Sequence, residues 1–301
     1  MGAMRVIRLV MVAWAVCGVA RAQSPVERAA LLTYEGHPEQ ALEVLAPALS
    51  GAYQKNPHAW CIMGFAYKAQ FYEQRSREPE DASRLGAISS FQRCLQLAPN
   101  AQDALDARNS LEALAKSFFQ DAYAQTLQFK PGDDEQVIAL LGRYEATWAQ
   151  LHPKDDFTEV EFDMYLRLAQ ANSALLDPEV GLEEHERGAV FEHVVAHYER
   201  AGELMPTDDR PLYNLAVTWY NEGVRKIRAI NRQVTLTELM RIQSECVDYF
   251  NRALGFMESA YAIHSTMPRN LNGLMIIHRA LDHREESARF KAELESLKER
   301  D

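Results

Sequence analysis

The sequence predicts an all-α protein, a solenoid in which antiparallel helical hairpins stack in a row. Three observations support this class. After residue 24, almost every long segment has apolar residues at three- and four-residue intervals, and none keeps a two-residue alternation. Short Pro- and Gly-containing breaks separate these segments. Large and small apolar residues also recur in the same register at three places along the chain.

The breaks divide the chain into five or six expected hairpins, because each break carries helix-stopping residues. They fall at Gly36-His37-Pro38, Asn56-Pro57, Pro99-Asn100, Lys130-Pro131-Gly132, His152-Pro153, Asp177-Pro178, Pro206-Thr207 and Pro268. The hairpins are expected at about residues 24–50, 57–98, 101–152, 157–205, 208–264 and 270–299. The last one breaks near Asp282, and its final helix has a densely charged outer face, as the end of a solenoid requires.

Three segments share one register of large and small residues. The first reads Trp60-x2-Met63-Gly64-x2-Tyr67, then Ala87-x3-Phe91-x2-Cys94 and Pro99. The second reads Tyr165-x2-Leu168-Ala169-x2-Asn172, then Val194-x3-Tyr198-x2-Ala201 and Pro206, and the third reads Leu212-x2-Leu215-Ala216-x2-Trp219, then Ala253-x3-Met257-x2-Ala260. This register resembles the tetratricopeptide repeat, W-x2-L-G-x2-Y followed by A-x3-F and P. The resemblance implies a superhelix of paired helices from about residue 23 to residue 301.

The small residues of this register are expected where two antiparallel helices approach closely. A large residue one turn earlier and an aromatic one turn later fill the space on either side. The close-approach positions are Gly64, Ala169 and Ala216. A bulky substitution at any of them should cost about 1 to 3 kcal/mol through overpacking.

Two insertions depart from the 34-residue period of the repeat. They are "EQRSREPEDASRLG" (73–86) and "RKIRAINRQVTLTELMRIQ" (225–243), and each must lengthen helices or add a loop at the same edge of the stack. Insertions of this kind gather on one face of a solenoid. We therefore hypothesise that this edge is a second contact surface.

The first 22 residues have the layout of a secretory signal peptide. Arg5 and Arg8 precede an apolar run from 9 to 19, and Ala20-Arg21-Ala22 is a small-x-small cleavage site. Cleavage would leave a periplasmic or secreted bacterial protein that starts at Gln23 and has no membrane-spanning segment. The alternative is a lipoprotein anchored through Cys17, although Trp14-Ala15-Val16 matches a lipobox poorly.

The charge left after cleavage excludes some partners. The chain would keep 29 basic and 43 acidic residues, a formal charge of −14. Such a surface repels phosphate backbones and anionic lipid, so nucleic acid is not an expected partner and neither is a membrane surface.

The sequence carries no motif of a catalytic or phosphate-binding site, so we expect a non-enzymatic protein without a cofactor. Cys61, Cys94 and Cys246 lie in apolar helical contexts and are expected to pack as small apolar residues. His193 and His197 stand one turn apart, which would suit a metal ion, but we expect them on a solvated helix flank. Acidic pairs such as Asp133-Asp134 are expected to cap helices.

The family resemblance points to a binding groove. In tetratricopeptide proteins the first helix of each hairpin lines the concave side, next to its packing stripe. Here that stripe contains Cys61, Phe65, Lys68, Leu166, Gln170, Ser173, Tyr213, Val217, Tyr220, Asn272, Ile276 and Arg279. Their mixture of apolar, aromatic and polar side chains suits a peptide. The family's carboxylate clamp of repeated Lys and Asn is not reproduced.

We therefore expect an interaction scaffold in the bacterial envelope or the secreted space, with a protein or peptide partner in the groove. One alternative is a component of outer-membrane assembly or secretion machinery. Another is a carbohydrate- or metal-binding accessory protein.

Overall fold

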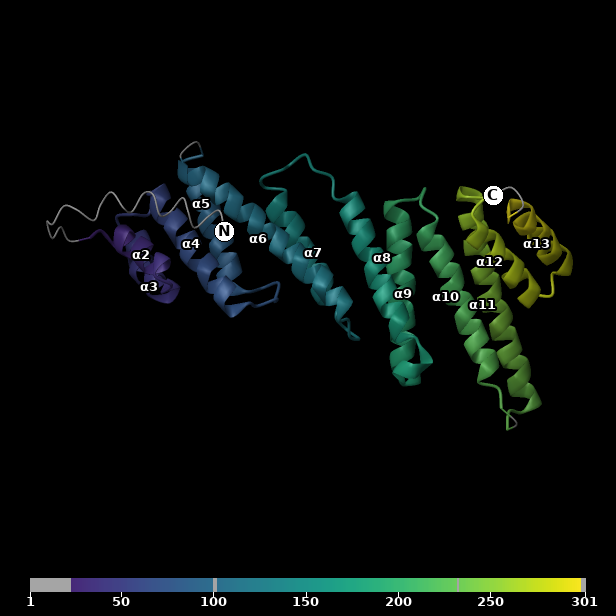
Figure 1. Cartoon of the computed structure of the whole chain (residues 1–301). Coiled ribbons are helices and arrows are strands. Elements are labelled where there is room, and N and C mark those ends of the chain that lie inside the picture. Colours follow the sequence, from purple (N-terminus) through teal and green to yellow (C-terminus); the bar gives the residue numbers. More distant parts are fainter. Residues whose placement is uncertain (1–22, 100–101, 232, 299–301) are drawn as a thin grey trace. The chain divides into compact units, whose positions relative to one another are not determined.

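The structure, a computed structural model, describes residues 23–99, 102–231 and 233–298, and its regular elements in these ranges are all helices (Figure 1). The predicted all-α class is confirmed. The signal peptide and Cys17 lie outside the described residues.

The α-helices are α2 (Pro25–Tyr34), α3 (Pro38–Leu49), α4 (Pro57–Gln74), α5 (Ala82–Leu97), α6 (Gln102–Leu127), α7 (Asp134–Trp148), α8 (Thr158–Leu175), α9 (Glu184–Leu204), α10 (Arg210–Arg228), α11 (Leu236–Ile263), α12 (Pro268–Ala280) and α13 (Arg284–Lys298), with a short 3-10 helix at Pro178–Val180.

Local chemistry explains where many of these helices begin. Helices α2, α3, α4, α10 and α12 have proline in the first turn, where its missing N–H costs no hydrogen bond. Ser24 and Glu27 form a capping box in front of α2, and the side chain of Asn56 accepts the N–H of Ala59 at 3.1 Å.

The described residues form two compact units, which divide inside α6 between Leu114 and Ala115. In the first unit α2 packs on α3 and α4 on α5. In the second, α8 packs on α9, α10 on α11 and α12 on α13. Each pair consists of consecutive helices, so both units have the hairpin architecture of a tetratricopeptide-like fold.

The predicted close-approach positions lie in these hairpins. Ala169 and Ala216 have no exposed surface, and Gly64 is buried. A Cβ added to Gly64 would lie 2.7 Å from the ring of Phe91. Two further glycines hold the same kind of contact, Gly223 against Phe250 and Gly273 against Met257.

The two insertions take different forms. In the first, α4 ends at Arg75 in a left-handed conformation, and the buried Arg84 holds the following loop. The guanidinium of Arg84 donates to the carbonyl of Ser76 at 2.9 Å and lies 4.3 Å from the centre of the Phe71 ring. The second insertion lengthens helices, so that α11 has 28 residues whereas α12 beside it has 13.

Among the described residues, no helix is both long enough and apolar enough to cross a membrane.

Candidate functional site: two cavities beside helix α10

Helix α10 lies between two cavities of the second unit. We call them the aromatic cavity, of about 390 Å³, and the groove cavity, of about 890 Å³. Both volumes fall in the range of small-ligand and peptide side-chain sites. The close contact of Gly223 with Phe250 brings α10 and α11 together at this level. Trp219, one turn earlier, is buried.

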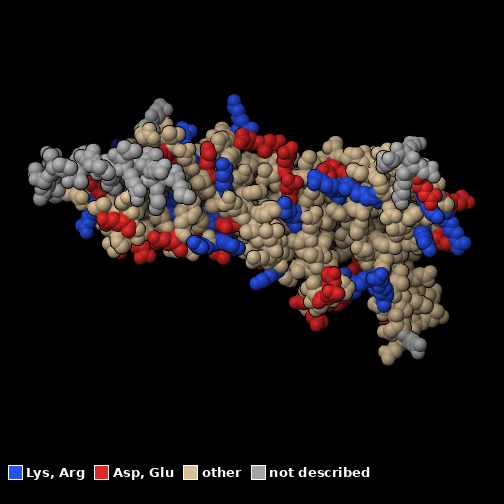
Figure 2. Space-filling view, viewed as in Figure 1, with Lys and Arg blue, Asp and Glu red and all other residues tan. Residues whose placement is uncertain are grey.

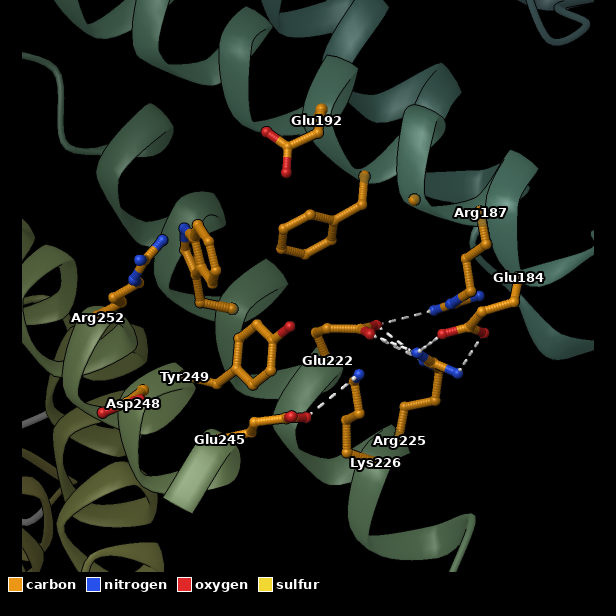
Figure 3. Close-up of a pocket in the computed structure, with 13 residues that line it drawn as sticks. Glu184, Arg187, Glu192, Glu222, Arg225, Lys226, Glu245, Asp248, Tyr249 and Arg252 are labelled. Carbon is orange, nitrogen blue, oxygen red and sulfur yellow. Dashed lines mark hydrogen bonds and ion pairs between the residues drawn. The ribbon is translucent and has the colours of Figure 1, made fainter. Parts of the chain in front are cut away.

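Three helices line the aromatic cavity, α9, α10 and α11 (Figure 3). Its lining residues are Glu184, Arg187, Gly188, Phe191, Glu192, Trp219, Glu222, Arg225, Lys226, Glu245, Asp248, Tyr249 and Arg252. The ring of Phe191 meets that of Trp219 edge to face at 4.9 Å, and Tyr249 lies 5.6 Å from Trp219. The guanidinium of Arg252 lies 4.6 Å from the centre of the Trp219 ring, a cation–π contact. The cavity therefore has an aromatic wall with a cation against it.

Glu222 is the centre of an ion-pair network on the other wall. Its carboxylate accepts from Arg187 at 3.4 Å and from the Nε of Arg225 at 2.9 Å, and Arg225 also donates to Glu184 at 2.8 Å (Figure 3). The hydrogen bonds that Arg225 donates, first to Glu222 and then to Glu184, raise the pKa of Arg225. The bond from Arg225 likewise lowers the pKa of Glu184. The network fixes three charged side chains and leaves the buried carboxylate of Glu222 paired.

Other charged groups of the aromatic cavity are less constrained. Lys226 pairs with Glu245 at 3.5 Å. Glu192 on α9 and Asp248 on α11 have no ion pair within the described part of the chain (Figure 3). The indole N–H of Trp219 is buried and has no acceptor among the described residues. The cavity thus offers an aromatic surface with both donors and acceptors around it.

Three helices and the α8–α9 connection line the groove cavity. Its lining residues are Ser173, Ala174, Leu176, Asp177, Pro178, Arg187, Phe191, Tyr198, Asn214, Val217, Thr218, Tyr220, Asn221, Glu222, Val224, Arg225, Arg228 and Ala229. Four of them, Arg187, Phe191, Glu222 and Arg225, also line the aromatic cavity. The Glu222 network is therefore the wall that separates the two cavities.

The structure brings three of the predicted groove residues together in the groove cavity: Ser173, Val217 and Tyr220. Tyr213, one turn before Val217 on α10, lines neither cavity and is half-buried, with the guanidinium of Arg269 5.2 Å from its ring centre. Tyr220 packs on Phe250, with ring centres 5.3 Å apart. This part of the predicted stripe lies at a cavity large enough for peptide side chains.

The other predicted groove residues are placed differently. Cys61 and Leu166 are buried, 1% and 5% exposed, so their side chains are not presented at the surface. Phe65 packs edge to face on Phe91, and Lys68 donates to the hydroxyl of Ser110. Gln170, Asn272 and Arg279 are exposed and Ile276 is half-buried, and none of the four lines either cavity.

A cluster around Asp134 corrects the prediction for His197. Asp133 or Asp134 was expected to cap α7, and Asp133 takes the N-cap position without a side-chain cap hydrogen bond, with Asp134 in the first turn. His193 and His197 were expected on a solvated flank, and His193 is exposed whereas His197 is buried. The Asp134 carboxylate accepts from Asn172 at 2.7 Å and bonds His193 at 3.0 Å and His197 at 2.6 Å. His197 is only 8% exposed. No group of three or more His, Cys, Asp or Glu in the described ranges is arranged to hold a metal ion.

Sequence reasoning missed most of the aromatic cavity. It assigned Trp219 to hairpin packing and did not single out Phe191, Tyr249 or Glu222. The spacing of Glu222 and Arg225, three residues apart on one helix, is a visible sign of an ion pair. Arg187 is 35 residues away along the chain, and no local pattern connects it to them.

Comparisons with known proteins find similarity only among solved structures. No protein family matches the chain, and no curated protein does. A crystal structure of MamA protein is similar over 79% of this chain and 92% of that one, with 14% identity and a TM-score of 0.35. A structure of the human IFIT1 dimer with m7Gppp-AAAA is similar over 92% of this chain and 69% of that one, with 15% identity and a TM-score of 0.28. Because both TM-scores are below 0.5, these similarities establish no relationship.

Proposed function

We propose that the protein is a non-enzymatic interaction scaffold of the tetratricopeptide type, and that it binds a peptide or protein segment at the groove cavity. The observation that carries the proposal is the meeting of Ser173, Val217 and Tyr220 in a cavity of about 890 Å³. These residues come from the stripe that the family resemblance assigns to partner binding.

The chemistry of the groove cavity supports a peptide as the occupant. Val217 and Tyr220 supply apolar and aromatic surface, and Asn214 and Asn221 supply amide donors and acceptors on the same helix. A peptide needs both, because its side chains bury apolar area while its backbone groups require hydrogen bonds. Arg187 and Arg225 are already paired with Glu222, so Asp177 and Arg228 are the charged lining residues that have no ion pair among the described residues.

The test is affinity capture from a native cell envelope, comparing wild type with Tyr213→Ala plus Tyr220→Ala. The proposal predicts that specific partners are lost in this variant. A matched control is Tyr34→Ala plus Tyr72→Ala, since both tyrosines are about half exposed and belong to the other unit. Circular dichroism must show that both variants keep the wild-type helix content. Equal recovery of the same partners by the groove variant would refute the proposal.

Export to the bacterial envelope is the second part of the proposal, and it depends on residues 1–22. Cleavage before Gln23 would be detected as a new N-terminus by mass spectrometry of the purified protein. A role in outer-membrane assembly or secretion machinery would instead be supported by palmitate labelling that disappears in Cys17→Ser.

A further inference from the structure

Two buried cysteines of the first unit lie in one helical hairpin. Cys61 is on α4 and Cys94 on α5, and the two side chains are 1% and 0% exposed. The two helices are consecutive, joined by the short connection 75–81 and packed on each other, so they run antiparallel (Figure 1). Both cysteines are free thiols in the structure. Whether they can be joined depends on the register of this helix pair.

The close contact of Gly64 with Phe91 fixes that register. A Cβ on Gly64 would lie 2.7 Å from the Phe91 ring. Cys61 comes three residues before Gly64, and Cys94 comes three residues after Phe91. In an antiparallel pair both steps lead about one turn in the same direction, so the two cysteines face each other. A hydrogen bond between the two thiols agrees with this register.

The spacing of packed helices suits a disulfide at such a position. Helix axes pack about 8 to 10 Å apart, and the Cα atoms lie about 2.3 Å from the axis. Directly facing Cα atoms are therefore about 4 to 6 Å apart, and a disulfide joins Cα atoms about 4.4 to 6.8 Å apart. Because Gly64 has no side chain to separate the helices, α4 and α5 can approach within this range one turn from the cysteines.

We propose that Cys61 and Cys94 form a disulfide that links α4 to α5. The oxidant is another disulfide, that of oxidised glutathione or of a thiol–disulfide oxidoreductase. The thiolate of one cysteine attacks it, forms a mixed disulfide and releases one thiol; the other cysteine then attacks the sulfur of the first and releases the second thiol. Two cysteine thiols are thus oxidised to one disulfide, and their two electrons and two protons pass to the oxidant, which becomes two thiols.

The exchange takes place while the hairpin folds or when it opens locally. A dissolved oxidant meets the folded protein at its outer surface, where acidic, basic and uncharged side chains are all found (Figure 2), and neither thiol is presented there. The thiols are therefore accessible before α4 and α5 have packed, or in a locally unfolded state. The same burial protects the finished disulfide from reductants.

Cys246 has no such partner. It lies on α11 in the second unit, with its thiol 3.5 Å from the carbonyl oxygen of Gly223, and the other two cysteines of the described ranges lie in the first unit. The protein would thus carry one disulfide and one free thiol. In the cell the disulfide also needs an oxidising compartment, which rests on the export proposed above, whereas the bond itself can be tested without export.

The test is the redox equilibrium of the bond with glutathione, measured on the full chain with Cys17→Ser, which removes the thiol outside the described residues. This parent chain is brought to equilibrium with reduced and oxidised glutathione in native buffer and in urea, and linked peptides are quantified by mass spectrometry. The main product should join Cys61 to Cys94. Its equilibrium constant should be roughly tenfold or more higher in native buffer than in urea, because the fold holds the two thiols together.

Alkylation in urea gives a second measurement. Iodoacetamide should label all three thiols of the chain prepared with a reductant. It should label Cys246 alone in the chain prepared with oxidised glutathione, because a disulfide sulfur is not alkylated.

A matched control is Ser90→Cys plus Cys94→Ser in the same parent chain. Ser90 is buried on α5, one turn before Cys94, so the thiols at positions 61 and 90 close a loop of similar length but lie one turn out of register. In urea the control should form its disulfide as readily as the parent. Folding should give the control no increase in the equilibrium constant.

The proposal is overturned if the equilibrium constant of the parent chain is no higher in native buffer than in urea, or if the control gains as much from folding. It is also overturned if glutathione adducts or links to Cys246 predominate in native buffer. The lining of the groove cavity lies in the second unit, so partner capture tests the proposed function separately.

Discussion

Gly64 on α4 and Phe91 on α5 are in such close contact that a methyl group on Gly64 would lie 2.7 Å from the aromatic ring. Phe91 has no exposed surface and also packs on Phe65, so its ring has little room to move. Gly64→Ala should therefore lower the free energy of unfolding by about 1 kcal/mol, even though alanine gains about as much in helix propensity. Urea denaturation followed by circular dichroism measures the difference.

Gly255 on α11 provides the control, because a Cβ added there meets nothing within 4 Å. Gly255→Ala should raise the free energy of unfolding by about 0.8 kcal/mol through helix propensity alone. If Gly64→Ala also stabilises the protein, α4 and α5 do not approach as closely as the structure shows.

The fold could be predicted because its determinants are local. The spacing that places Gly64 between Trp60 and Tyr67 lies within one helix, and proline marks the first turn of α4, α10 and α12. Helix periodicity and chain breaks are read within a few residues. The class and the pairing of consecutive helices follow from them.

The cavities and the buried polar clusters could not be predicted, because they join distant residues. His197 is 63 residues from Asp134, and Arg187 is 35 residues from Glu222. Helical periodicity also did not predict which individual side chains are exposed. Cys61 was assigned to the groove stripe but is buried, with its thiol 3.6 Å from the carbonyl oxygen of Asp103.

Asp134 should be one of the most important polar residues for stability. Burial would raise the pKa of its carboxyl group, but hydrogen bonds from His197, Asn172 and His193 outweigh burial and lower the pKa to about 2. Asp134→Ala should cost about 2 to 4 kcal/mol at pH 7, because it leaves the buried His197 without this partner and removes one of the two acceptors of the Asn172 amide, the other being the carbonyl of Leu168. The measurement is urea denaturation, with the exposed Asp163→Ala as the control.

The stabilisation that Asp134 contributes should decrease as the pH falls. Its pKa is lower in the folded state than its ordinary value of 3.8, so the ionised carboxylate stabilises the fold fully above pH 4. This contribution is lost as the pH falls toward 2. The difference between wild type and Asp134→Ala should therefore shrink over that interval, and a constant difference would contradict the assignment.

Glu145 on α7 should destabilise the protein at alkaline pH. Burial, followed by repulsion from Glu161, raises the pKa of its carboxyl group from 4.5 to about 7, and its buried Oε1 has no hydrogen-bond partner. Since the folded state holds the proton more tightly, stability falls as the pH rises from 4.5 to above 7. Glu145→Gln should be about 1 kcal/mol more stable than wild type at pH 8, after allowance for solvent screening, and equal to it near pH 4.

Thermal unfolding at the two pH values measures the effect of Glu145→Gln. The control is Glu199→Gln, an exposed position in the interior of α9, which should change the melting temperature at neither pH. A gain of the same size at both pH values would show that ionisation of Glu145 is not the cause.

The three cysteines of the described chain should not react in the folded protein. Cys61, Cys94 and Cys246 are all buried, and a hydrogen bond between the thiols of Cys61 and Cys94, together with burial, raises the pKa of Cys61. The same hydrogen bond lowers the pKa of Cys94, so for Cys94 it is the lack of any exposed surface that should prevent alkylation. Burial likewise raises the pKa of Cys246. Because the thiolate is the reactive form, iodoacetamide at pH 8 should label none of the three until urea is added. Mass spectrometry of the alkylated protein distinguishes the outcomes, and labelling of any of them in the native state would show that its helix opens.

Glu222 should be required both for stability and for the separation of the two cavities. Its buried carboxylate pairs with Arg187 and Arg225, and replacement by leucine leaves both guanidinium groups without this partner. Removing one member of a buried pair costs about 3 to 5 kcal/mol. Arg200→Met is the control, because the ion pairs of Arg200 with Glu161 and Glu203 are exposed and should contribute less than about 1 kcal/mol.

In a double-mutant cycle, Arg187→Met and Glu222→Gln should show a coupling of about 1 kcal/mol or more, since the two side chains are in direct contact. Additive effects of the two substitutions would mean that each residue acts through other neighbours and that the wall between the cavities is not held by this pair.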